Sequence, residues 1–144
     1  MILIILPLRE TLPINILSSC LDDVKNSYKY YWFLAIIEHL NETGEKSILL
    51  KDLAFRMISN VWYPLDYYKL SFGKQDGFKN ISNFLSSKIE FDHTPKSPSL
   101  YNQINNSLSR NEVQILYNEI YKLIRYVPYR FLRPFFKNEL RRID

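Results

Sequence analysis

Cysteine and glycine are scarce in this chain of 144 residues, and each shortage excludes a class of site. Cys20 is the single cysteine, so the chain has neither an internal disulfide nor a cysteine-based zinc site. A reduced protein of the cytoplasm, with a half-buried thiol, is therefore expected. Three glycines cannot build a phosphate-cradling loop, and neither G-x-x-x-x-G-K-S/T nor G-x-G-x-x-G occurs.

A catalytic or metal-binding constellation is also missing from the sequence. Histidine occurs twice, and His39 is expected in the last turn of a helix, where the helix dipole favours it. His93 stands beside Asp92 in the loop sequence FDHTP, without the third ligand that a metal site requires. The sequence DDVK at 22–25 has the residue types of a nuclease metal site, but helix ends contain them anyway. We therefore predict no catalytic residue, no metal site and no cofactor in this chain.

Long hydrophobic runs are absent as well. Residues 2–6 are apolar, but Pro7 ends the run and no basic residue precedes it, unlike a signal peptide. Residues 30–37 form the other apolar run, which is far shorter than the roughly 20 residues that cross a bilayer. We predict no membrane segment and no membrane partner.

Positive charge gathers at one end of the chain. The formal net charge is +4, and residues 122–144 hold seven lysines and arginines against two acids. The rest of the chain holds twelve basic and thirteen acidic side chains and is therefore close to neutral. This asymmetry suits an anionic partner, although a solvated helix end gives the same pattern.

The hydrophobic pattern predicts an all-α fold of five to six helices in a compact bundle. The central helix is expected at about 27–43, with Ser27 as its N-cap and Gly44 as its stop. Residues 30–37 are apolar on every side, which indicates a helix covered by its neighbours. A buried strand is the rival interpretation for so short a run.

Two further helices have clear signals. A full apolar stripe runs from Leu50 to Trp62, with Arg56 on its polar face, and Pro64 should stop this helix by about Tyr63. Ser109 and Glu112 form a capping box before the second stripe. Weaker helices are expected at about 15–22, from a cap at Asp76 through Leu85, at 100–108, and from Pro134 onward.

These helices make one domain, 1–144. It has an extended lead-in at 1–14, an exposed loop at about 90–99 and an irregular, proline-containing junction segment at 125–144. The junction holds the basic excess. Its side chains predicted to contact the phosphates of a nucleic acid are Arg125, Arg130, Arg133, Lys137, Arg141 and Arg142.

The aromatic residues of the junction have two interpretations. Their rings could stack on bases. In helical register, however, Phe131, Phe135 and Phe136 share one face, while the basic side chains take another. The pattern favours aromatics that point inward to the core and arginines that point outward.

Three stretches together resemble a known family. They are LPINILSSCLDDVKNSYKYYWFLAIIEHL, MISNVWYPLDYYKLSFGKQDGF and RYVPYRFLRPFF, and in this order they resemble the helical N-terminal region of bacterial, Bacteroidetes-type HNH endonuclease-like proteins. In that family an HNH nuclease module follows. No residue here matches its ββα-metal site, so no catalytic residue is carried over. The resemblance implies a truncated piece or a shortened relative without the nuclease.

Two functions are compatible with these features. The first is a non-catalytic accessory domain of an HNH nuclease-like protein, which positions or recognises nucleic acid, such as DNA, for an absent catalytic module. The second is a protein–protein interaction or dimerisation module, whose apolar surface seals against a C-terminal nuclease domain or a second copy of the chain.

Overall fold

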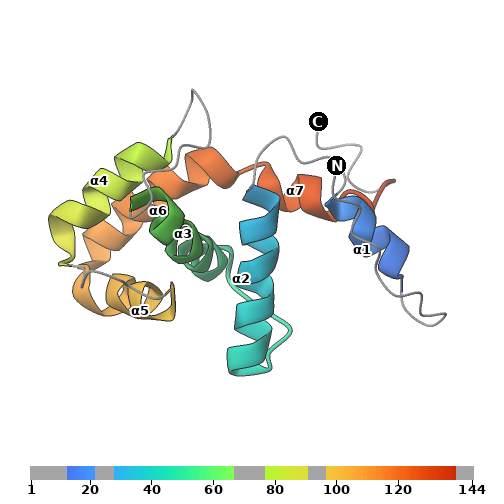
Figure 1. Cartoon of the computed structure of the whole chain (residues 1–144), viewed down its shortest axis with the longest axis horizontal. Helices are drawn as coiled ribbons and strands as arrows, with labels where there is room; N and C mark the ends of the chain where they lie inside the picture. Colours follow the sequence, from blue (N-terminus) through green and yellow to red (C-terminus); the bar gives the residue numbers. More distant parts are fainter. Residues whose placement is uncertain (1–12, 22–27, 67–76, 91–96, 139–144) are drawn as a thin grey trace.

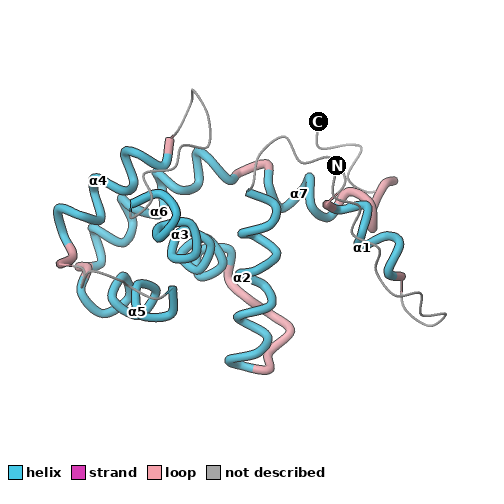
Figure 2. The backbone as a smooth tube through the Cα atoms, viewed as in Figure 1, coloured by secondary structure: helices cyan, strands magenta, loops and turns pink. Residues whose placement is uncertain are grey.

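A computed structural model describes residues 13–21, 28–66, 77–90 and 97–138, and the described part contains helices and no strand (Figure 2). The predicted all-α class is confirmed, with seven helices in this part rather than five or six. The helices are α1 (Ile14–Cys20), α2 (Tyr28–Thr43), α3 (Leu50–Asp66), α4 (Phe78–Lys88), α5 (Ser97–Ser107), α6 (Arg110–Ile124) and α7 (Val127–Leu132).

The centre of the fold is α3. It packs against α2, α4, α5 and α6, and every side chain from 53 to 59 is buried (Figure 1). This includes Ser59 and also Arg56, which the sequence placed on a polar face. The cause is that neighbouring helices cover α3 all round. The apolar stripe in the sequence identifies one buried face of the helix, but it does not show that other helices also cover the polar face.

The prediction that the helix at 27–43 is central is wrong. The helix itself exists as α2, but its buried side chains are limited to Trp32, Ala35 and His39. Its opposite face leaves Tyr30, Leu34 and Ile37 more than one-third exposed. A helix that is apolar all round is therefore not covered all round in this chain, and α2 lies at the side of α3 (Figure 1).

Several predicted helix ends are confirmed. Gly44 adopts φ 70°, and its N–H donates to the Leu40 carbonyl at 2.9 Å, which closes α2. The capping box also forms. The Ser109 N–H donates to Oε2 of Glu112 at 2.9 Å, and the Glu112 N–H donates to Oγ of Ser109 at 3.3 Å.

Other predicted boundaries are wrong. Helix α3 continues through Pro64 to Asp66, because a proline near a helix end removes one hydrogen bond of the last turn without ending it there. Helix α5 begins at Ser97, inside the predicted loop 90–99. No helix starts at Pro134, since residues 133–138 form turns. The predicted caps Ser27 and Asp76, the lead-in up to residue 12 and the loop 91–96 lie outside the described residues.

Helix α7 is held at the side of the bundle. Pro128 lies in its first turn, where its fixed φ suits a helix start. Val127 and Phe131 are buried, and the Phe131 ring stacks on Phe33 of α2 with centroids 5.7 Å apart. The helix thus lies against α2 on one side and α1 on the other (Figure 1). This packing fixes the orientation of the side chains around α7.

Candidate functional site

The basic–aromatic segment, defined here as residues 125–138, runs from the end of α6 through α7 to the following turns. Four of the six predicted phosphate contacts lie in it, and all four are exposed: Arg125, Arg130, Arg133 and Lys137. The segment contains no acidic residue. Its charges therefore add to a positive potential that attracts anions. Arg141 and Arg142 lie outside the described residues.

The prediction that the aromatic residues of this segment point inward is wrong for most of them. Phe131 is buried, but four rings are exposed, to 53% for Tyr126, 45% for Tyr129, 36% for Phe135 and 48% for Phe136. The reason is that α7 ends at Leu132, so the helical register does not extend to the last two rings. The Phe135 and Phe136 N–H groups instead both donate to the Leu132 carbonyl, at 3.0 and 3.2 Å.

Tyr126 joins the basic and aromatic features of the segment. The guanidinium carbon of Arg125 lies 4.6 Å from the centroid of its ring, and that of Arg130 lies 5.9 Å away. Both distances are within cation–π range. Guanidinium groups that can bind phosphate are thus held next to a ring that is more than half exposed.

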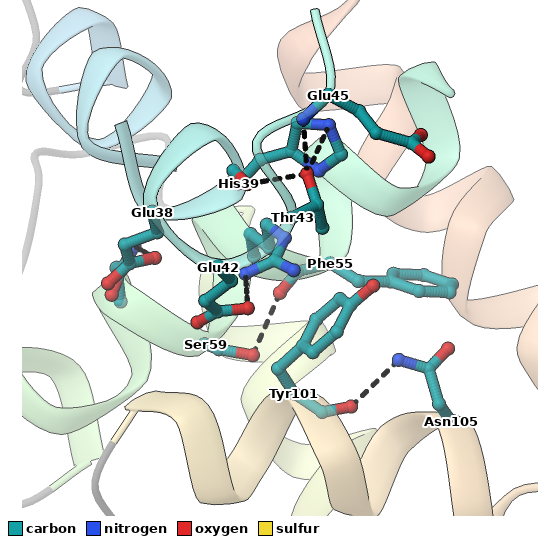
Figure 3. A network of polar contacts seen from close by, with 11 residues as sticks. Glu38, His39, Glu42, Thr43, Glu45, Phe55, Ser59, Tyr101 and Asn105 are labelled. Carbon is teal, nitrogen blue, oxygen red and sulfur yellow. Dashed lines mark hydrogen bonds and ion pairs between the residues drawn. The ribbon is translucent and has the colours of Figure 1, made fainter. Parts of the chain in front are cut away.

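A second polar cluster joins α2, α3 and α5 (Figure 3). Arg56 is buried, and its Nη1 lies 2.7 Å from Oε2 of Glu42, which is about half exposed. The same guanidinium lies 4.3 Å from the centroid of the Tyr101 ring, while its Nε is buried without a hydrogen-bond partner. Burial, and then the Asp52 carboxylate, raises the pKa of Tyr101, and the Arg56 charge opposes the shift. A phenol with a raised pKa stays protonated at neutral pH and supplies no general base.

Sequence reasoning missed this cluster. The polar residues of α3 look solvent-exposed in the sequence, and the helix that covers them is 45 positions away at Tyr101, a distance that no local pattern reports. The only signal in the sequence is Tyr101 in the weaker helix expected at 100–108, because the face of a tyrosine ring can bind a cation.

The remaining candidate side chains have structural roles or lie outside the described residues. His39 is 9% exposed, and its Nε2 donates to the Ser47 carbonyl at 3.1 Å, which ties α2 to the connection that follows it. Cys20 is fully buried, and its thiol donates to the Ile16 carbonyl at 3.3 Å. His93 and residues 22–25 lie outside the described residues.

The described part has neither a cluster of metal ligands nor a helix suited to a membrane. Among those residues, no three His, Cys, Asp or Glu side chains gather closely enough to hold a metal ion. None of the helices there has both the length and the apolar character needed to span a bilayer.

Comparisons with known proteins give no match. No protein-family model, no curated protein and no solved structure matches the chain. The function therefore has to be inferred from the chemistry of the surface itself.

Proposed function

We propose that this chain is a non-catalytic helical module that binds nucleic acid through the basic–aromatic segment. The observation that supports the proposal is the set of four exposed basic side chains, with no acid among them, interleaved with four exposed aromatic rings. Arginine offers a planar fork that matches phosphate oxygens, and aromatic rings accept bases.

The wider role follows from the family resemblance. As an accessory domain of an HNH endonuclease-like protein, the module would position DNA for a catalytic module that this chain does not contain. A cytoplasmic location, expected from the single cysteine, suits such a partner.

The test is the salt dependence of DNA binding by fluorescence anisotropy. Each phosphate contact contributes a slope of about −0.9 on duplex and about −0.7 on single strands in a plot of log affinity against log salt. The triple variant Arg125→Gln/Arg130→Gln/Lys137→Gln should weaken binding and flatten the slope by about 2 to 3. The proposal would be contradicted if the unmodified protein does not bind DNA at low salt, or if its affinity does not change with salt concentration.

A matched control removes three exposed basic side chains elsewhere, as Lys46→Gln/Lys79→Gln/Arg110→Gln. Both triple variants lower the net charge equally. If the control weakens binding as much as the first variant, the affinity reflects overall charge, and the basic–aromatic segment is not the binding surface.

A second candidate function rests on a different surface. Tyr30, Leu34 and Ile37 lie at i, i+4 and i+7 on the exposed face of α2, with 45%, 42% and 37% exposure. This is the spacing of the seam along which two helices pair, so a second copy of the chain is the occupant that fits. Sedimentation over a concentration series should then show a dimer that Leu34→Gln/Ile37→Gln dissociates. Ile115→Gln, at a 43% exposed site on α6, is the control.

A further inference from the structure

We infer that the basic–aromatic segment binds single-stranded nucleic acid in preference to duplex, with unpaired bases stacked on the rings of Tyr126 and Phe136. The inference rests on the proposed function, because it names the kind of nucleic acid that the same surface takes.

The exposed rings are the first argument. Tyr126, Tyr129, Phe135 and Phe136 lie within eleven consecutive positions, and each is at least 36% exposed. Contiguous exposed apolar groups often mark binding sites, and the rings of Phe135 and Phe136 lie next to each other with centroids 6.5 Å apart. Contacts to phosphates do not require exposed aromatic rings, so these rings indicate a second kind of contact. In a duplex the faces of the bases are already stacked on each other, so only unpaired bases are free to cover these rings.

The geometry around Tyr126 is the second argument. Its ring is 53% exposed and lies 4.6 Å and 5.9 Å from the guanidinium carbons of Arg125 and Arg130. A nucleotide carries its base and its phosphate a short distance apart. Base stacking on the ring and a phosphate contact to either arginine can therefore be made by one nucleotide or by two neighbours.

The two phenylalanines make a second stacking position. Their ring centroids lie 6.5 Å apart with the planes tilted by 47°, so one base cannot lie flat on both rings. Phe136 is the more exposed, at 48% against 36%. We therefore assign the base to Phe136 and a supporting role to Phe135.

The packing of α7 argues against duplex recognition by a helix. With six residues it is about 9 Å long, and Val127 and Phe131 bury one side of it against the bundle. A recognition helix must enter a major groove about 8.5 Å deep, and a short helix that lies flat on its own domain does not protrude far enough.

The experiment compares three labelled oligonucleotides of about 20 nucleotides, namely oligo-dT, a duplex, and an abasic single strand with phosphates but no bases. A purely electrostatic surface prefers the duplex, because its charge density is higher. Stacking reverses this order. We expect oligo-dT to bind at least tenfold more tightly than the abasic strand and more tightly than the duplex, since each stacked base is worth about 1–3 kcal/mol.

The variants locate the effect. Tyr126→Ala and Phe136→Ala should each lower the affinity for oligo-dT at least fivefold and leave the affinity for the abasic strand unchanged, while Tyr126→Phe keeps the affinity for oligo-dT. Tyr121→Ala removes a 41% exposed tyrosine from α6, outside the basic–aromatic segment and the exposed face of α2, and is the control. Far-UV circular dichroism checks that each variant is folded.

The outcomes separate the two proposals. If the duplex and the abasic strand bind as tightly as oligo-dT, or if the ring variants lose all three ligands equally, base stacking is overturned while nucleic-acid binding stands. If none of the three oligonucleotides binds at low salt, the result contradicts the proposed function and therefore also this inference.

Discussion

The guanidinium group of Arg56 lies 4.3 Å from the centroid of the Tyr101 ring, which joins the central helix α3 to α5 through a buried cation. The carboxylate partner of Arg56 is Glu42 on α2, whose Oε2 lies 2.7 Å from Nη1 of Arg56. The two charges differ in burial, since the Arg56 side chain is 7% exposed and the Glu42 side chain 46%. The pair is therefore asymmetric, and its two partners should not be equivalent in stability.

We expect removal of the exposed partner to be the more damaging change. Glu42→Gln leaves a buried cation without its counter-ion and should lower the free energy of unfolding by about 2 kcal/mol. Arg56→Met removes the buried charge, keeps most of the volume and leaves the carboxylate half in water, so it should stay within about 1 kcal/mol of the unmodified protein. Urea denaturation of both variants and of the double variant measures this. A larger loss from Arg56→Met than from Glu42→Gln would contradict the explanation.

Gly44 gives a prediction about backbone conformation. Its φ of 70° lies in the left-handed region, and nothing lies within 4 Å of the place where a Cβ would stand. Gly44→Ala should therefore cost about 1 kcal/mol of stability through backbone strain alone. Asparagine tolerates this region better, so Gly44→Asn should lose less than Gly44→Ala in the same denaturation experiment. Equal losses from the two variants would point to a different cause.

Gly77 should respond for another reason. Its φ is −65°, which any residue adopts, but a Cβ would collide with the side chain of Leu123 on α6. Gly77→Ala should cost about 1–2 kcal/mol as overpacking, because the partly buried Leu123 has to move. The shorter side chain of Leu123→Val should make the Gly77→Ala change less costly in a double-mutant cycle. An additive cycle would show that the two sites do not touch.

Local signals in the sequence were sufficient for the helix ends that depend on neighbouring residues. The Ser109–Glu112 capping box and the stop at Gly44 are formed by groups at most four positions apart, so the sequence alone predicts them. The all-α class follows from the same kind of periodicity. The prediction of helices at the positions of α3 and α6 is confirmed for this reason.

What depends on distant partners could not be predicted in this way. Whether Arg56 is exposed is decided by α2 and α5, and whether α2 or α3 is central is decided by how many helices pack on each. The exposed rings of Phe135 and Phe136 were missed because the helical register was extended past Leu132, where α7 ends. The basic side chains Arg125, Arg130 and Arg133 were found from composition alone.

Glu112 gives a prediction about pH. The Ser109 N–H, the Lys88 side chain and the Ser109 side chain lower the pKa of Glu112 from 4.5 to about 2. Lys88 Nζ lies 3.0 Å from Oε1. A carboxylate with a lowered pKa contributes stability that is complete above its ordinary pKa and is lost as the pH falls toward the lowered one. The stabilisation should therefore decline between pH 4.5 and about 2.

The measurement is the urea midpoint of the unmodified protein and of Glu112→Gln at a series of pH values. The unmodified protein should be the more stable one at neutral pH, and the difference should disappear as the pH approaches 2. Glu90→Gln removes an exposed carboxylate outside the capping box and should show no such difference. A gap between Glu112→Gln and the unmodified protein that persists at the lowest pH would contradict the assignment.

The contact between Phe131 and Phe33 connects the fold to the proposed binding surface. These rings stack with centroids 5.7 Å apart, and Phe131 and Val127 are the buried side chains that hold α7. Phe131→Ala should cost about 3 kcal/mol, and Phe131→Leu about 1 kcal/mol. Because so short a helix is not stable alone, the loss should appear first as fast amide exchange in α7.

Hydrogen exchange by mass spectrometry measures that loss helix by helix. In Phe131→Leu, the amides of α7 should lose protection while those of α3 keep it, and oligo-dT binding should weaken because the rings and arginines around α7 are no longer held in place. Leu116→Val, a matched change in the core at α6, should lower global stability without a selective effect on α7 or on binding. Equal protection of α7 in the two variants would show that Phe131 does not anchor the candidate site.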